Sequence, residues 1–157
     1  MFFIFSGAFN TIQPHLLVQK LLNMKLPSSV TSWIFDYLTS RFQYVRLNGL
    51  LSSAIGTNTG APQGTVLAPF LFALYTADSR SIDESCPLVK FADVTELVGK
   101  ISNDEDALYH KQIENFVNWC DKNYLYLNVS ETKEMCIDFR KNQRCPKPVY
   151  IKGEAAE

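Results

Sequence analysis

Four short segments of the sequence contain residues that could bind a ligand or take part in a reaction. In chain order they span residues 6–12, 60–64, 90–93 and 127–133. The third ends in Asp93, a carboxylate expected in the turn between two β-prone runs. Carboxylate oxygens suit a hard cation such as Mg²⁺. A lone carboxylate in a turn is, however, more often structural than catalytic, so Asp93 alone does not define a site.

The remaining segments each have a structural explanation beside a functional one. Gln63 lies between Pro62 and Gly64, and glycines allow a backbone to approach a ligand closely. The structural alternative is a Gly-Pro turn before a buried helix. Phe9 is equally suited to a core position after a strand, and Lys133 to a basic surface near Arg140.

Cysteine and histidine spacing gives no sign of a metal centre or a disulfide framework. The cysteines form no C-x-x-C pair, and the two histidines, His15 and His110, are isolated in sequence. A core of this size needs no disulfides, so we expect an intracellular protein that is not secreted. The apolar run Met1–Phe5 is too short for a signal peptide, and no run approaches the ~20 residues of a membrane span. The cysteines are Cys86, Cys120, Cys136 and Cys145.

Composition indicates a folded chain of one domain. Of 157 residues, 46% are hydrophobic and 13% aromatic, and the net charge is −1, which argues against disorder. Charge is unevenly distributed: residues 1–64 carry four basic residues against one acidic, residues 78–121 ten acidic against four basic, and residues 122–152 seven basic against three acidic. The basic flanks could follow a phosphate backbone, but they are far sparser than in a dedicated nucleic-acid binder. Ordinary solvated faces remain the alternative.

Hydrophobic periodicity predicts helices near residues 14–24, 28–40, 65–78 and 104–123. The first begins at Pro14, and Ser28 or Ser29 can cap the second. The third is nearly all apolar from residue 66 to 75, which predicts burial on every side. The fourth follows a capping-box pattern at residues 102–105. Two apolar stripes are expected, on the second helix at Val30, Trp33, Ile34, Tyr37 and Leu38, and on the fourth at Tyr109, Ile113, Phe116, Val117, Cys120 and Tyr124.

Strands are predicted at residues 1–5, 44–47, 87–91, 96–101, 135–139 and 149–151. Asn48-Gly49 is a turn signal, and residues 92–95 should connect two of the strands as a hairpin. Helices interleaved with hairpin-connected strands predict an α+β fold, an antiparallel sheet with helices packed on one face.

The four segments, taken together and in this order, resemble the palm of reverse transcriptases from non-LTR (LINE-type) retrotransposons. The segments that carry the resemblance read Ser6-Gly7-Ala8-Phe9-Asn10-Thr11-Ile12, Gly60-Ala61-Pro62-Gln63-Gly64, Lys90-Phe91-Ala92-Asp93 and Leu127-Asn128-Val129-Ser130-Glu131-Thr132-Lys133. The resemblance extends from about Phe3 to Glu157. It implies RNA-directed DNA synthesis, an RNA template, a DNA primer, and Mg²⁺ held by converging carboxylates.

The resemblance assigns a role to individual residues and also exposes two departures. Asp93 matches the first of two adjacent hairpin aspartates, but Val94 occupies the second position and Ile4 the position of the first-strand aspartate. Asp93 is therefore the retained member of the catalytic trio and at most a vestigial metal ligand. Phe9 matches the residue under the nucleotide sugar, and Gln63 with Gly64 the loop near the incoming nucleotide. Lys133 resembles the lysine that the family carries after its fourth palm helix.

These departures leave two kinds of function to consider. The first is a polymerase palm, residues 1–157 as one partial domain without fingers or thumb, that no longer catalyses or binds Mg²⁺ productively. The second is a non-catalytic module that binds nucleic acid weakly or binds a partner protein. A third possibility is a retroelement relic with no selected role. Charge pattern does not separate these alternatives, and the sequence does not indicate an oligomeric state.

Overall fold

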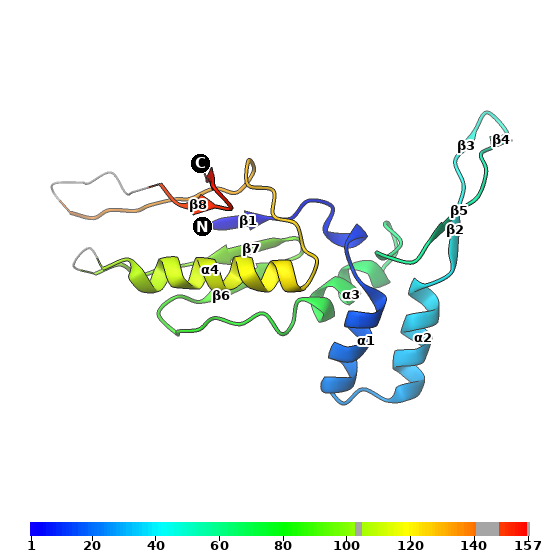
Figure 1. The fold of residues 1–157 in the computed structure, drawn as a ribbon, viewed down its shortest axis with the longest axis horizontal. Helices are drawn as coiled ribbons and strands as arrows, with labels where there is room; N and C mark the ends of the chain where they lie inside the picture. The colour runs from blue at the N-terminus through cyan, green and yellow to red at the C-terminus, as the bar shows by residue number, and fades with distance from the viewer. Residues whose placement is uncertain (103–104, 141–147, 157) are drawn as a thin grey trace. The chain divides into compact units, whose positions relative to one another are not determined.

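The computed structural model describes residues 1–102, 105–140 and 148–156, and the chain divides into two compact units (Figure 1). The first unit combines residues 1–6 with the chain from residue 79 onward, and the second comprises Gly7–Asp78. Within the described residues, no helix is long and apolar enough to cross a membrane.

The first unit is built on a three-stranded antiparallel sheet, as the sequence predicts. Its strands β1 (Phe2–Ile4), β7 (Val94–Leu97) and β6 (Leu88–Phe91) follow one another in the order β1-β7-β6. The turn between β6 and β7 comprises only Ala92 and Asp93, so the predicted connection over residues 92–95 is too long. Ala92 has a φ of 52°, and this backbone conformation closes the hairpin two residues earlier than side-chain alternation suggests.

Helix α4 (Ala107–Lys122) supplies the apolar layer against this sheet. Phe116 contacts Phe3 of β1, with ring centroids 4.6 Å apart, and both rings are buried. The predicted stripe is largely confirmed, but Tyr124 is exposed because the helix ends two residues before it. The helix begins after Asp106 rather than within the predicted capping box, of which residues 103 and 104 lie outside the described part.

The C-terminal part of the first unit departs from prediction at one strand. Residues 135–139 form no strand in the described structure, although Met135, Ile137 and Phe139 alternate with polar residues. All three are exposed, Phe139 at 94%, and none of them pairs with another strand within the described residues. The short last strand is confirmed as β8 (Tyr150–Ile151), which pairs with β9 (Glu154–Ala155).

The second unit contains three helices where three were predicted: α1 (Pro14–Asn23), α2 (Ser28–Leu38) and α3 (Leu67–Tyr75). A short 3-10 helix, η1 (Ala8–Asn10), precedes them. The prediction that α3 is buried on every side is wrong, because Phe70 is 58% exposed. Its buried face consists of Ala68, Leu71, Phe72 and Tyr75.

The buried stripe of α2 differs from the predicted one. Thr31, Ile34 and Leu38 are buried, whereas Val30 and Trp33 are exposed. The Thr31 hydroxyl donates a hydrogen bond of 2.9 Å to the Ser28 carbonyl, so this polar side chain can be buried at little cost. Neither Ser28 nor Ser29 caps the helix, whose N-cap is Pro27.

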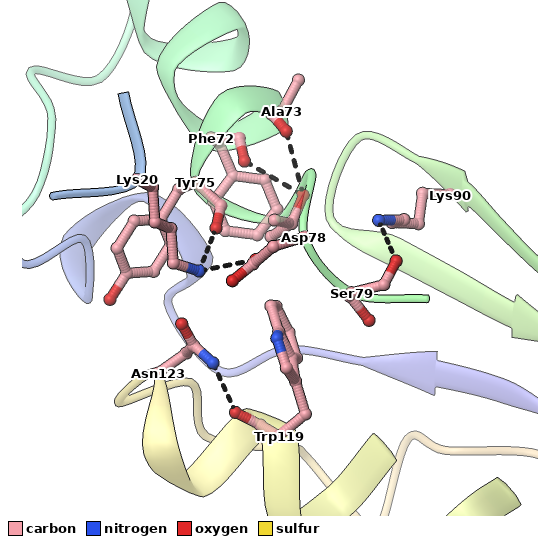
Figure 2. A network of polar contacts seen from close by, with 10 residues as sticks. Lys20, Phe72, Ala73, Tyr75, Asp78, Ser79, Lys90, Trp119 and Asn123 are labelled. Atoms are coloured by element: carbon pink, nitrogen blue, oxygen red, sulfur yellow. Dashed lines mark hydrogen bonds and ion pairs between the residues drawn. The ribbon is translucent and has the colours of Figure 1, made fainter. Parts of the chain in front are cut away.

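A buried lysine connects two of these helices within the second unit (Figure 2). Lys20 of α1 donates hydrogen bonds to the Tyr75 carbonyl at 2.6 Å and to the Asp78 carboxylate at 2.7 Å. Its ammonium also lies 4.7 Å from the centre of the Tyr75 ring. The Lys20 ammonium therefore lies at the C-terminal end of α3, where main-chain carbonyls carry partial negative charge and a cation is stabilising.

A β-arm, residues 41–57, extends from the end of α2. It consists of β2 (Arg41–Gln43) paired with β5 (Ile55–Thr57), and of β3 (Arg46–Leu47) paired with β4 (Leu50–Leu51). Asn48 and Gly49 both have positive φ, 51° and 83°, which confirms the predicted tight turn. Seven large apolar side chains of the arm are 58–77% exposed, namely Phe42, Tyr44, Val45, Leu47, Leu50, Leu51 and Ile55.

Candidate polymerase palm site

One candidate site is the junction of β1 and β7 in the first unit. Ile4 pairs directly with Val94, and Phe3 with Thr95. Asp93 is the second residue of the two-residue turn, directly before Val94 of β7, and is half-buried. The register partner of Ile4 is therefore Val94, and Asp93 lies in the turn that precedes β7.

The fourth segment lies on the other side of β1. Leu127 forms an antiparallel bridge with Phe5, and Lys133 one with Phe2. The Asn128 N–H donates a hydrogen bond of 2.8 Å to the Ile4 carbonyl. Two of the four segments, residues 90–93 and 127–133, thus lie next to Ile4. Asn128 belongs to the fourth segment, but its contact with Ile4 is a main-chain hydrogen bond that side-chain chemistry could not have indicated.

The donor groups at this junction do not fit a two-metal site. Such a site needs several oxygen ligands converging on ions about 3.5–4 Å apart. Asp93 provides a carboxylate, but the paired positions Ile4 and Val94 offer only hydrocarbon. Among the described residues, no three His, Cys, Asp or Glu side chains are grouped so that they could hold a metal ion.

A separate candidate site, within the second unit, is formed where η1 meets the loop of residues 60–64. Gln63 donates a side-chain hydrogen bond of 3.1 Å to the Asn10 side chain, and the Ala61 N–H donates one of 2.8 Å to the Phe9 carbonyl. Phe9 is half-buried, and its ring meets Phe72 edge-on at 5.4 Å. These hydrogen bonds therefore hold the segment that contains Phe9 against the loop that contains Gln63.

Gly60 explains why this loop can lie so close to η1. A Cβ at Gly60 would come within 2.8 Å of Asn10 Cα and 2.9 Å of the Phe9 carbonyl oxygen, and its φ is +72°. Gly64 also has positive φ, +77°, but faces open space. Arg41 fixes the loop from the other side, donating hydrogen bonds of 2.7 Å to the carbonyls of Thr59 and Gly60. No sequence pattern around Arg41 indicates this role.

Comparison with protein families identifies the chain. Residues 1–150 match the family described as reverse transcriptase (RNA-dependent DNA polymerase), so the chain belongs to the reverse transcriptase family. One relative is the probable RNA-directed DNA polymerase from transposon X-element of Drosophila melanogaster, 29% identical over 143 residues. The match covers 87% of this chain and 16% of that relative, so the chain spans a small part of the relative's length. Both findings confirm the resemblance to reverse transcriptases of non-LTR retrotransposons.

Proposed function

We propose that this chain is the palm of a retrotransposon reverse transcriptase, one partial domain over residues 1–157, that does not catalyse DNA synthesis. One observation carries the proposal: Ile4 and Val94 are cross-strand partners beside Asp93. In the family resemblance these two positions belong to aspartates that bind catalytic Mg²⁺. Two hydrocarbon side chains there leave Asp93 as a vestigial ligand, without partners to share an ion.

The residues matched to nucleotide binding, in the second unit, are better retained than those matched to metal binding, in the first. Phe9 would lie under the sugar of an incoming nucleotide, with Gln63 and Gly64 beside it. The hydrogen bond between Gln63 and Asn10 and the edge-on contact of Phe9 with Phe72 support a preserved local structure. This favours a second candidate function, non-catalytic binding of a template RNA and DNA primer inside the cell, over a fully degraded site.

A primer-extension assay tests the proposal. The chain is incubated with a primed RNA template, the four deoxynucleotides and Mg²⁺ or Mn²⁺, beside an Asp93→Ala variant. We expect no template-dependent extension above background by either protein. Extension by the parent chain that Asp93→Ala abolishes would overturn the proposal, because Asp93 would then be a working catalytic residue.

A further inference from the structure

The turn at the tip of the β-arm joins an asparagine to a glycine, two residues that can react with each other. The main-chain nitrogen of Gly49 can close a five-membered ring by attacking the side-chain amide carbon of Asn48. Gly49 has no side chain to hinder this approach, and a Cβ built at Gly49 would meet nothing within 4 Å. Asn48 is the only asparagine of the sequence that precedes a glycine.

The side-chain amide of Asn48 is accessible to water. Asn48 and Gly49 are both exposed, and within the described residues no hydrogen bond is found to the Asn48 side chain. Asn58, at the base of the same arm, is equally classed as exposed, but its side-chain oxygen accepts a hydrogen bond of 2.9 Å from the Ser40 N–H. Asn58 also precedes Thr59, whose β-branched side chain crowds the main-chain nitrogen. Asn58 is therefore a built-in comparison for Asn48.

The short ladder behind the turn allows the backbone to rearrange for the reaction. The φ values of Asn48 and Gly49, 51° and 83°, hold both residues in the left-handed region while the turn is closed. Strands β3 and β4 are joined by only two residue pairs, and a two-stranded hairpin is marginally stable in water. Local opening of such a pair costs little free energy, and it frees the Gly49 nitrogen to reach the Asn48 amide carbon.

We propose that Asn48 is a site of spontaneous deamidation in the folded chain. The Gly49 nitrogen forms a bond to the Asn48 side-chain amide carbon, and the original amide bond of that carbon breaks. The amide nitrogen leaves as ammonia, with the proton of the Gly49 N–H. One water molecule then hydrolyses the ring at either carbonyl, which leaves aspartate or isoaspartate at position 48. The reaction needs only water and is independent of the metal-ligand positions and of the proposed loss of catalysis.

The isoaspartate product should separate β3 from β4. It adds a methylene to the main chain inside a two-residue turn and replaces a neutral amide with a carboxylate. Loop length fixes the register of a hairpin, so the longer main chain no longer fits the pairing of Leu47 with Leu50. Strands β2 and β5 have three residue pairs at the base of the arm and should stay paired.

Prolonged incubation of the whole chain in mildly alkaline buffer, followed by peptide mapping with mass spectrometry, tests the proposal. Aspartate and isoaspartate should form at Asn48 at least about tenfold faster than at Asn58, a difference of about 1.4 kcal/mol in activation free energy. Asn48→Gly is the control variant, because it removes the reacting amide and keeps a residue that suits the turn. Amide hydrogen exchange at residues 46–51 should become faster in the incubated parent and stay unchanged in incubated Asn48→Gly. Exchange at residues 41–43 should not change in either protein.

Three outcomes would overturn the proposal. The folded turn protects Asn48 if no product forms there during a period in which the urea-unfolded chain is converted. Equal conversion at Asn48 and Asn58 would show that neither the following glycine nor the unbonded amide makes Asn48 special. Conversion at Asn48 without faster exchange at residues 46–51 would show that the product does not separate β3 from β4.

Discussion

Ile4 and Val94 face each other across two hydrogen-bonded strands, so the chemistry of the junction depends on both side chains together. Directly opposed residues of an antiparallel pair have Cβ atoms about 4.5–5.5 Å apart. Carboxylates at both positions would stand next to Asp93 and could share an ion. Hydrocarbon at both positions removes that option but also removes the repulsion among three anions.

Restoring the carboxylates should therefore create a metal site at a cost in stability. We expect Ile4→Asp with Val94→Asp to bind Mn²⁺ measurably by calorimetric titration, where the parent binds negligibly. Without metal the variant should lose about 2–3 kcal/mol of unfolding free energy, since Ile4 is half-buried and the new anions repel. Ile4→Asn with Val94→Asn is the control of similar shape without charge. Equal, negligible Mn²⁺ binding by all three proteins would mean that these positions do not form the metal site.

Lys20 shows a different consequence of placing a charge inside the molecule. Burial lowers the pKa of its ammonium below the ordinary value of 10.5, while the hydrogen bond and the charge of Asp78 oppose that shift. In the window just below pH 10.5 the unfolded chain therefore binds more protons at this site than the folded chain. The contribution of Lys20 to the unfolding free energy consequently rises with pH through that window and is lowest below it.

Comparison with Lys20→Met tests this sign. The variant should be less stable by about 1–3 kcal/mol, because the Tyr75 carbonyl and Asp78 lose a donor, and its deficit should grow as pH rises toward 10.5. Urea titration followed by Trp33 fluorescence, in a Trp119→Phe background, reports on the second unit, which contains Lys20. Lys111→Met, an exposed lysine of α4, should show a small deficit that does not change with pH. A deficit for Lys20→Met that shrinks with rising pH would contradict the argument.

Among the elements, the loop of residues 60–64 has the most restricted backbone. Both Gly60 and Gly64 have positive φ, but only Gly60 lies against the backbone of η1. Gly60→Ala should therefore cost about 1–3 kcal/mol more unfolding free energy than Gly64→Ala, since both replacements share the conformational cost and only the first creates a clash. Urea titrations of the two variants measure the difference. Equal losses would show that η1 moves away without penalty.

The elements that the sequence predicted well are those with a strong local signal. Asn48-Gly49 specifies its own turn through two positive φ values, and Pro14 starts α1 where its missing N–H is harmless. The two-residue turn at Ala92-Asp93 was missed because alanine carries no preference for positive φ. The strand expected over residues 135–139 failed because alternation indicates a strand only where a neighbour is available to pair with it.

The candidate site divides along the same lines. Asp93, Phe9 and Gln63 could be selected from sequence because they occur in segments with a recognisable order. Arg41 could not, since it lies in none of these segments. Asn10 and Asn128 lie in two of them, but their hydrogen bonds to Gln63 and to the Ile4 carbonyl join residues far apart in the chain and could not be predicted. Arg41 donates its hydrogen bonds to main-chain carbonyls. Every residue has such a carbonyl, so the identity of the accepting residues does not predict the contact.

For the molecule as a whole, charge sets a limit on binding to RNA. The net charge is −1, and several basic side chains are already paired with acidic ones, including Lys20 with Asp78 and Arg140 with Asp138. Lys152 is likewise paired with Asp121. Neutralisation of phosphates by the remaining basic groups should be slight, because binding strength and its salt dependence both follow the number of phosphates contacted.

We therefore expect single-stranded RNA to bind weakly and with little dependence on salt. Fluorescence anisotropy with a labelled 20-nucleotide RNA should give a dissociation constant above about 100 μM near 150 mM salt, and a log–log salt slope no steeper than about −2. Asp121→Asn should tighten binding, because it frees the Lys152 ammonium as well as removing a negative charge. Glu114→Gln removes the same charge from the exposed surface of α4 and should have a smaller effect. If the two variants bind RNA equally well, net charge alone governs the interaction, and the release of Lys152 from its ion pair contributes nothing to it.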